Sequence, residues 1–189
     1  HTHTRTREMP SNVEVKARVR NLSDLLARIE AVVTTAPRVI EQRDTFFVCP
    51  NGRVKLREFG TNEEHAGAVA ELIWYARDDV TGSKLSQFKR ASVDTDAVQL
   101  RDVLSTAYGV VGSVVKRRLL YMHESTHTRV HVDQVEGLGT FIELEVQVQP
   151  GQSLEDAHAI AARLTNDFGI EPADHIAGAY MDMLLAPSQ

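Results

Sequence analysis

Polar and aliphatic side chains alternate along several segments of this sequence, and ions occupy most of the polar positions. Successive side chains of a β-strand point to opposite faces, so the alternation predicts strands with one ionic and one aliphatic face. In the first segment the aliphatic face is formed by Val13, Val15, Ala17 and Val19. The opposite face is formed by Asn12, Glu14, Lys16, Arg18 and Arg20. One side of this strand is therefore expected to pack on apolar groups and the other to meet ions or water.

Four later segments repeat the arrangement. Residues 53–57 set three cations against two aliphatic side chains, and residues 141–149 place two glutamates on one face. In residues 114–119, Lys116 and Arg118 share a face, although Arg117 interrupts the alternation. The remaining ionic positions of these faces, including those of residues 129–133, are Arg53, Lys55, Arg57, Arg129, His131, Asp133, Glu143 and Glu145.

Two architectures are compatible with such strands. An open antiparallel sheet would rest its aliphatic face on helices and leave the charges in water. A closed barrel would instead enclose the ions, which could not stay dry and unpaired, so the interior would hold water, metal and an anionic ligand. The ionic faces carry more cations than acids, although the chain as a whole has a formal net charge of −5. This local excess of positive charge favours a polyanionic ligand.

Apolar residues recur at helical spacing in four stretches, which predicts helices near residues 23–33, 94–109, 153–169 and 174–185. Each is expected to pack its apolar face against the sheet. Polar, glycine-containing segments at residues 61–67 and 78–83 are expected to be loops between strands.

Length and composition narrow the functional classes. The 189 residues, 42% hydrophobic and 25% charged, fit a single soluble domain, assigned to residues 11–189, after a flexible tail at 1–10. The negative charge disfavours a nucleic-acid or anionic-membrane partner, and no apolar run approaches the ~18 residues of a membrane span. Cys49 is the single cysteine, which excludes a disulfide framework and suits a cytoplasmic location. A monomer and a homodimer both remain open.

A series of motifs along residues 12–185 resembles the CYTH superfamily, the triphosphate tunnel metalloenzymes, and within it the class IV adenylyl cyclase-like branch. The first motif matches the Glu-x-Glu-x-Lys signature at two of its three positions, because Asn12 stands where the family has a glutamate. The motifs are Asn12-Val13-Glu14-Val15-Lys16, Asp44-Thr45-Phe46-Phe47, Gly52-Arg53-Val54-Lys55-Leu56-Arg57, Gly82-Ser83-Lys84-Leu85-Ser86, Val115-Lys116-Arg117-Arg118, Arg129-Val130-His131-Val132-Asp133 and Gly137-Leu138-Gly139-Thr140-Phe141-Ile142-Glu143-Leu144-Glu145.

The resemblance implies an α+β fold, an eight-stranded antiparallel β-barrel that forms a tunnel, with helices packed outside. The implied triphosphate ligands are Lys16, Arg53, Lys55, Arg57, Lys84, Lys116, Arg118 and Arg129, with Arg77 as a further candidate. The implied metal ligands are Glu14, Glu143, Glu145 and Asp133, and the implied catalytic set is Glu14, Lys16, Asp133, Glu143 and Glu145. Carboxylate ligands suit Mg²⁺ or Mn²⁺. His131 is either a proton carrier or a structural or ligand-facing residue.

Three functions follow from the resemblance. The first is metal-dependent hydrolysis of a phosphoanhydride bond in an inorganic, nucleoside or other organic triphosphate. The second is cyclisation of ATP to cyclic AMP and pyrophosphate, which needs an adenine pocket that the sequence does not locate. The third is a catalytically silent tunnel that binds nucleotide or polyphosphate, motivated by the uncharged Asn12. Hydrolysis of a small-molecule triphosphate is ranked first.

Overall fold

The computed structural model describes residues 10–33, 35–60, 69–94 and 96–186. The predicted loop at 61–67 and nearly all of the predicted tail lie outside these residues. The strands are β1 (Ser11–Arg18), β2 (Arg38–Phe47), β3 (Arg53–Phe59), β4 (Ala70–Arg77), β5 (Lys84–Val93), β6 (Val110–His123), β7 (Thr128–Val135) and β8 (Gly139–Gln147). The helices are α1 (Leu22–Val32), α2 (Ala97–Tyr108), α3 (Leu154–Asp167) and α4 (Tyr180–Leu185), with 3₁₀ turns at Glu124–Thr126 and Pro172–Asp174.

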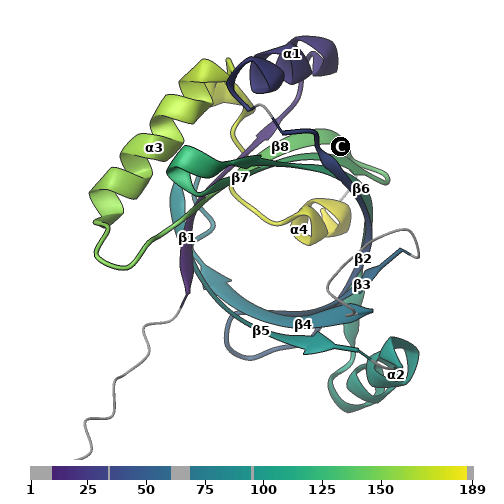
Figure 1. Ribbon diagram of the computed structural model, residues 1–189. Coiled ribbons are helices and arrows are strands. Elements are labelled where there is room, and N and C mark those ends of the chain that lie inside the picture. The colour runs from purple at the N-terminus through teal and green to yellow at the C-terminus, as the bar shows by residue number, and fades with distance from the viewer. Residues whose placement is uncertain (1–9, 34, 61–68, 95, 187–189) are drawn as a thin grey trace, which may run out of the picture.

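These eight strands close into an antiparallel barrel in the order β1-β5-β4-β3-β2-β6-β7-β8. The first strand completes the ring because it pairs with β5 on one side and with β8 on the other. Figure 1 looks along the barrel and shows its strands arranged as a ring. The fold class is the predicted one, and the alternative of an open sheet is excluded.

The aliphatic faces of the strands lie outside the barrel, under helices. Val13, Val15 and Ala17 of β1 are buried with Leu164 of α3 and Ile29 of α1 in one apolar cluster. Burial of apolar surface, at roughly 25 cal/mol per Å², supplies the main force that holds these helices on the barrel wall. Because the outer face of β1 is fixed in this way, Asn12, Glu14 and Lys16 must point inward.

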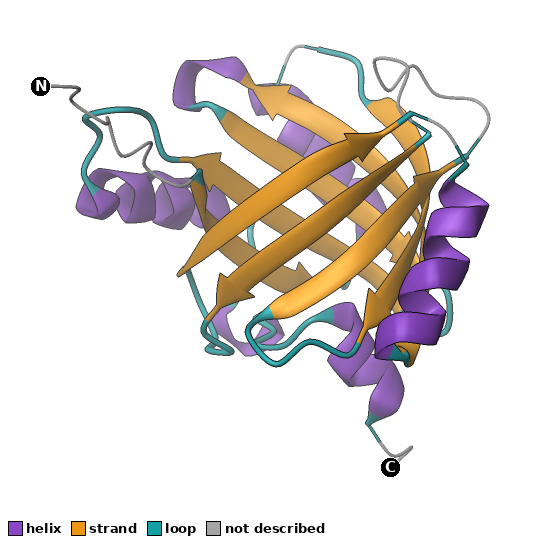
Figure 2. Cartoon of the chain, turned by 90° about the horizontal axis from the view of Figure 1, so that it is seen from below, coloured by secondary structure: helices purple, strands orange, loops and turns teal. Residues whose placement is uncertain are grey.

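The second helix covers another part of the wall. Leu56 of β3 and Phe47 of β2 are buried in a cluster against which Leu100 and Leu104 of α2 pack. Figure 2 shows helices lying against different parts of the strand cylinder. No helix among the described residues has the length and apolarity needed to cross a membrane.

The last helix is shorter than predicted. It begins at Tyr180 and not at Asp174, because the intervening segment binds β1 as an extended chain. His175 forms an isolated bridge with Ala17, and the Ile176 N–H donates to the Lys16 carbonyl at 2.9 Å. The helix then starts where the Asp182 carboxylate accepts from the Ala179 N–H at 2.8 Å. This arrangement places Tyr180 at one end of the barrel.

Candidate active site in the barrel tunnel

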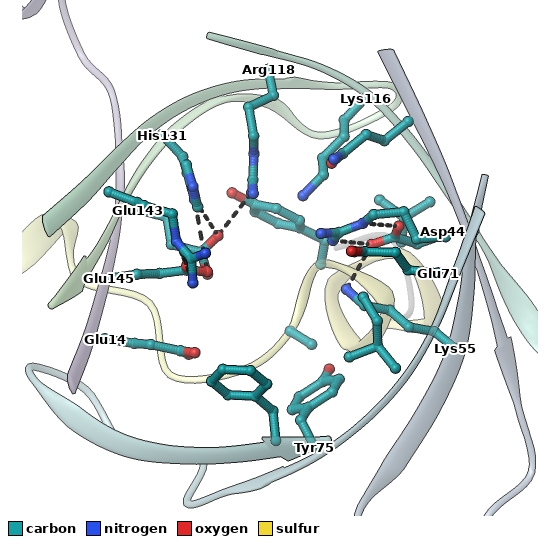
Figure 3. A pocket seen from close by; sticks show the side chains of 18 of the residues that line it. Glu14, Asp44, Lys55, Glu71, Tyr75, Lys116, Arg118, His131, Glu143 and Glu145 are labelled. Carbon is teal, nitrogen blue, oxygen red and sulfur yellow. Dashed lines mark hydrogen bonds and ion pairs between the residues drawn. The ribbon is translucent and has the colours of Figure 1, made fainter. Parts of the chain in front are cut away.

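The barrel encloses a cavity of about 230 Å³, and side chains from every described strand line it. Figure 3 shows acidic and basic groups converging on this space. The lining includes nine cations, namely Lys16, Arg38, Lys55, Arg57, Arg77, Arg90, Lys116, Arg118 and Arg129. Among the described residues it includes five acids, Glu14, Asp44, Glu71, Glu143 and Glu145. The lining thus carries a formal charge of about +4 inside a chain of charge −5.

Three carboxylates meet where β1 and β8 pair. Glu14 lies opposite Glu145 in this ladder, and Lys16 lies opposite Glu143. Burial, together with the charges of Glu143 and Glu145, raises the pKa of Glu14 despite the Arg77 guanidinium, which donates to it at 2.5 Å. Burial is the main cause of this raised pKa and the two glutamate charges add to it, so a cation bound beside Glu14 would favour its ionised form.

His131 of β7 faces the same two β8 glutamates. Its Nδ1 lies 3.5 Å from Glu143 Oε2 and 3.8 Å from Glu145 Oε1. Burial and the Arg118 charge lower the pKa of the imidazole, so the ring is neutral at pH 7. A neutral imidazole has a nitrogen lone pair that can bind a metal ion or accept a hydrogen bond.

The two β8 glutamates are also ion-paired. Glu143 accepts from Arg118 at 2.9 Å and lies 3.1 Å from the Lys16 ammonium. Glu145 accepts from Arg129 at 2.8 Å. Although burial opposes ionisation, these cations hold the pKa of Glu143 well below its usual range and lower that of Glu145 to about 2. Both are therefore carboxylates at neutral pH.

Asp133 is held by cations and a phenol. Arg118 donates to both of its oxygens at 2.6 Å, and Lys116 and the Tyr180 hydroxyl donate to Oδ2 at 3.2 and 3.0 Å. The side chain is completely buried behind these donors. The structure thus gives Asp133 the contacts of a residue that orients Arg118 and Lys116, while its predicted role as a metal ligand stays a prediction.

A second ionic group lies across the tunnel on β2 and β3. Asp44 accepts from Lys55 at 2.7 Å and from two nitrogens of Arg57 at 2.8 Å. Burial and the Arg57 charge lower the pKa of Lys55 to about 8, and burial with the Arg118 charge lowers that of Lys116 to about 7. Burial is the main cause of both depressed pKa values and the guanidinium charges add to it, so a bound anion would favour the charged form of each lysine.

The two ends of the tunnel differ. At the end beside α4, buried Phe46, Val114 and Phe141 belong to one apolar cluster with Tyr180. Further along the same strands, away from Tyr180, the lining becomes apolar between Arg38 and Arg90. This apolar part consists of Ile40, Phe59, Ile73, Phe88 and Leu120.

Most predicted site residues line the tunnel. They are Glu14, Lys16, Lys55, Arg57, Arg77, Lys116, Arg118, Arg129, His131, Glu143 and Glu145. Arg53 and Lys84 do not belong to the lining: Arg53 donates to Asp79 and Asp182, and Lys84 donates to the carbonyls of Val80 and Ala177. Asn12 does line the tunnel and is buried.

Sequence reasoning gave no site role to Asp44 or Tyr180. Asp44 stands in one of the motifs, and the alternation along β2 could have placed it on the inner face with Gln42 and Phe46. No strand alternation or motif marks Tyr180 in the sequence, because it enters the tunnel lining from helix α4 and not from a strand.

The residues present fit a divalent cation. The Nδ1 or Nε2 of His131 and carboxylate oxygens of Glu143 and Glu145 all lie within 4.8 Å of one another. This donor set of two carboxylates and one imidazole is one that divalent cations accept. It also lies near Glu14, whose pKa is raised mainly by burial and further by the Glu143 and Glu145 charges, and a positive ion would offset both effects.

The sequence profile of the CYTH domain matches residues 11–180. The chain belongs to the CYTH domain family. No curated protein matches its sequence. Solved structures of similar fold include the PH1012 protein of Pyrococcus horikoshii OT3, 20% identical with a TM-score of 0.76 over 90% of this chain and 98% of that one.

Two further neighbours carry functional descriptions. A candidate adenylate cyclase of Vibrio parahaemolyticus is 17% identical, with a TM-score of 0.70 over 93% of this chain and 98% of that chain. HpAC1 of Hippeastrum, a candidate adenylyl cyclase described as having a dominant triphosphatase activity, is 14% identical, with a TM-score of 0.59 over 92% and 94%. At these identities the likeness shows the CYTH fold alone.

Proposed function

We propose that this CYTH protein hydrolyses a phosphoanhydride bond of a triphosphate held in the tunnel, with the help of a divalent metal. The observation that carries the proposal is the charge of the lining, about +4 in a chain of −5. A triphosphate carries about four negative charges, and cations on opposite walls can neutralise it along its length. No nucleophilic side chain is required, because phosphoryl transfer needs mainly positioning and charge neutralisation.

The cations divide into two groups around the cavity. Lys16, Lys116 and Arg118 stand beside the β8 glutamates and Asp133, and Lys55 and Arg57 stand across from them on Asp44. In the proposal a triphosphate bridges the two groups of cations. Its phosphate oxygens then form some of the ion pairs that these cations make with the acids in the free protein. Arg118 and Arg57 suit this role, since a guanidinium can hold two phosphate oxygens at once.

Glu143 and Glu145, with Glu14 nearby, are proposed to hold Mg²⁺ or Mn²⁺. When bound, the metal would neutralise charge on the phosphoryl oxygens and activate a water. The protein's own contribution is to keep both glutamates ionised, through Lys16, Arg118 and Arg129. Asp133, which is buried behind Arg118, is proposed to orient that cation.

A second candidate function is cyclisation of ATP. The apolar lining of Ile40, Phe59, Ile73, Phe88 and Leu120 favours it, because this surface could receive a nucleoside beside the charged section. The same surface also favours an organic over an inorganic triphosphate as the substrate of a hydrolase. Hydrolysis remains the first proposal, since it needs only the charged section and a water.

One incubation series separates these functions. Inorganic triphosphate, ATP and thiamine triphosphate are each offered with Mg²⁺ or Mn²⁺, and phosphate, pyrophosphate and cyclic AMP are measured. Release of phosphate supports the hydrolase, and cyclic AMP with pyrophosphate would replace it by the cyclase. Tight binding without turnover of any substrate would contradict both enzymatic functions and favour a catalytically silent tunnel that only binds its ligand.

A pair of variants connects the activity with the tunnel. Glu145→Gln is expected to lower turnover about 100-fold or more, since it removes a charge from the proposed metal site. Glu136→Gln, which changes an exposed residue just after β7, should keep wild-type turnover and controls for the substitution. Equal activity in both variants would remove Glu145 from the mechanism.

A further inference from the structure

We propose that His131 is a protein ligand of the divalent metal, so that the centre is a mixed site of one imidazole nitrogen and the Glu143 and Glu145 carboxylates. The inference rests on the metal dependence proposed above and specifies which ion the site prefers. The sequence left the role of this histidine open. The structure assigns it through geometry, burial and the chemistry of its neighbours.

The geometry begins with strand register. His131 lies directly opposite Glu143 in the β7–β8 ladder, and Glu145 follows two residues later on the same face. Nδ1 is 3.5 Å from Glu143 Oε2 and 3.8 Å from Glu145 Oε1. Neighbouring ligand atoms of an ion with bonds of about 2.1 Å lie roughly 3 to 4 Å apart, so these separations need little adjustment.

Burial supplies an independent observation. The His131 side chain is 3% exposed, and the groups nearest its Nδ1 are the two carboxylates, at separations of 3.5 and 3.8 Å that leave this nitrogen without a well-formed hydrogen bond. A buried polar atom without a partner costs free energy, and such atoms in folded proteins call for an explanation. Figure 3 shows this ring directed at the two glutamates, within the tunnel and not toward its wall. A metal ion between them would satisfy the nitrogen.

The composition of the site then sets the ion. Mg²⁺ takes oxygen ligands almost exclusively, whereas an imidazole suits Mn²⁺ and later transition ions. Asn12, buried in the same lining, contributes no charge to this corner. Compared with a site that has a glutamate at position 12 and only oxygen ligands, this site has one carboxylate fewer and one nitrogen ligand. Both differences weaken the binding of Mg²⁺ more than that of Mn²⁺. We therefore expect Mn²⁺ to bind at least about tenfold more tightly than Mg²⁺.

The test is pulsed electron paramagnetic resonance of Mn²⁺ bound to the whole chain, which detects directly coordinated nitrogen through its nuclear modulation. Wild-type protein should show a nitrogen signal, and His131→Gln should lose it. In the same variant, Mn²⁺ affinity should fall about tenfold or more while Mg²⁺ affinity changes less than about threefold. His158→Gln, on α3 and bonded to Ser83 outside the lining, is the matched control and should change neither.

Further variants keep the outcome decisive. His1 and His3 could bind Mn²⁺ adventitiously, so a His1→Ala/His3→Ala protein must retain the nitrogen signal. This second protein also tests the inference if His131→Gln does not fold. Metal binding that depends on Glu145 but shows no nitrogen signal would overturn the role of His131 and leave the proposed function standing. Absence of any metal binding or metal-dependent turnover would overturn both.

Discussion

The hydroxyl of Tyr180 donates a hydrogen bond to Asp133 at 3.0 Å and so joins the last helix to the interior of the barrel. The Tyr180 ring lies 4.0 Å from the Lys16 ammonium and 5.3 Å from that of Lys116, and it packs at 4.9 Å on Phe141. One side chain thus lines the tunnel and borders two cations of the proposed phosphate site. Cation–π contact of this kind holds an ammonium in place without neutralising it.

Tyr180→Phe is expected to lower the free energy of unfolding by about 1 kcal/mol, because Asp133 loses one buried donor while the ring packing stays. Urea denaturation measures the change. Tyr108→Phe, at an exposed position on α2, controls for the loss of a hydroxyl and should shift stability by less than about 0.5 kcal/mol. Equal stability of Tyr180→Phe and the wild type would show that the hydrogen bond contributes nothing.

Asp44→Asn should destabilise the free protein by about 3 kcal/mol, because it leaves the partly buried Lys55 and Arg57 without the carboxylate of buried Asp44. Added triphosphate should restore more stability in this variant than in the wild type, since it no longer competes with Asp44 for these cations. Thermal unfolding with and without metal-free triphosphate checks both effects. Asp102→Asn, an exposed change on α2, is the control, and a smaller ligand-induced shift in Asp44→Asn would contradict the argument.

The pH dependence of binding follows from the lysines. Burial and Arg57 lower the pKa of Lys55 to about 8 in the free protein, and a bound anion would raise it again. Binding should therefore take up protons above pH 8, and affinity for triphosphate should fall as pH rises, by up to about tenfold per unit for each such lysine. Calorimetry in EDTA, in buffers of different ionisation enthalpy, measures the uptake. Lys55→Met should reduce it at pH 8.5, whereas the exposed Lys89→Met should not.

Asn12→Glu tests the departure from the family signature. The new carboxylate would enter the lining near Glu14 and raise metal affinity about tenfold, while weakening the binding of metal-free triphosphate by repulsion. Isothermal titration with Mn²⁺ and Mg²⁺ measures the first effect. Asn12→Gln matches the size of glutamate without its charge and should leave both affinities near the wild type. Unchanged metal binding and turnover in Asn12→Glu would show that the Asn12 amide does not weaken metal affinity or slow turnover.

Strand periodicity made the inner faces predictable. The aliphatic residues Val13 and Val15 had to be buried under helices, and this fixed Glu14 and Lys16 on the opposite side. The same logic placed Glu143 and Glu145 inside, and it set Arg117 apart from Lys116 and Arg118. Alternation also raised the possibility of an enclosed ionic lumen, and the family motifs supplied the number of strands.

Periodicity does not give the height of a residue along the barrel axis. Arg53 occupies an alternating position equivalent to Lys55, yet it lies beyond the lining and pairs with Asp182 of α4. Lys84 likewise ends among carbonyls of the 175–178 segment. Tyr180 could not be foreseen, because the helix that bears it was expected to start six residues earlier and to pack against the sheet. The contacts of these three residues depend on where the C-terminal segment packs against the barrel, and strand periodicity does not specify that.

Tyr180 packs with Phe46, Val114 and Phe141 in a buried apolar cluster beside α4, and this cluster borders the cavity. If the cluster closes its end of the barrel, a triphosphate with an organic group would enter from the opposite end, with its terminal phosphoryl leading toward Lys16 and Lys116. The organic group would trail and come to rest among Phe88 and its apolar neighbours. Under the proposed hydrolysis, the products would then leave through the opening by which the next triphosphate enters, so product release would compete with substrate entry.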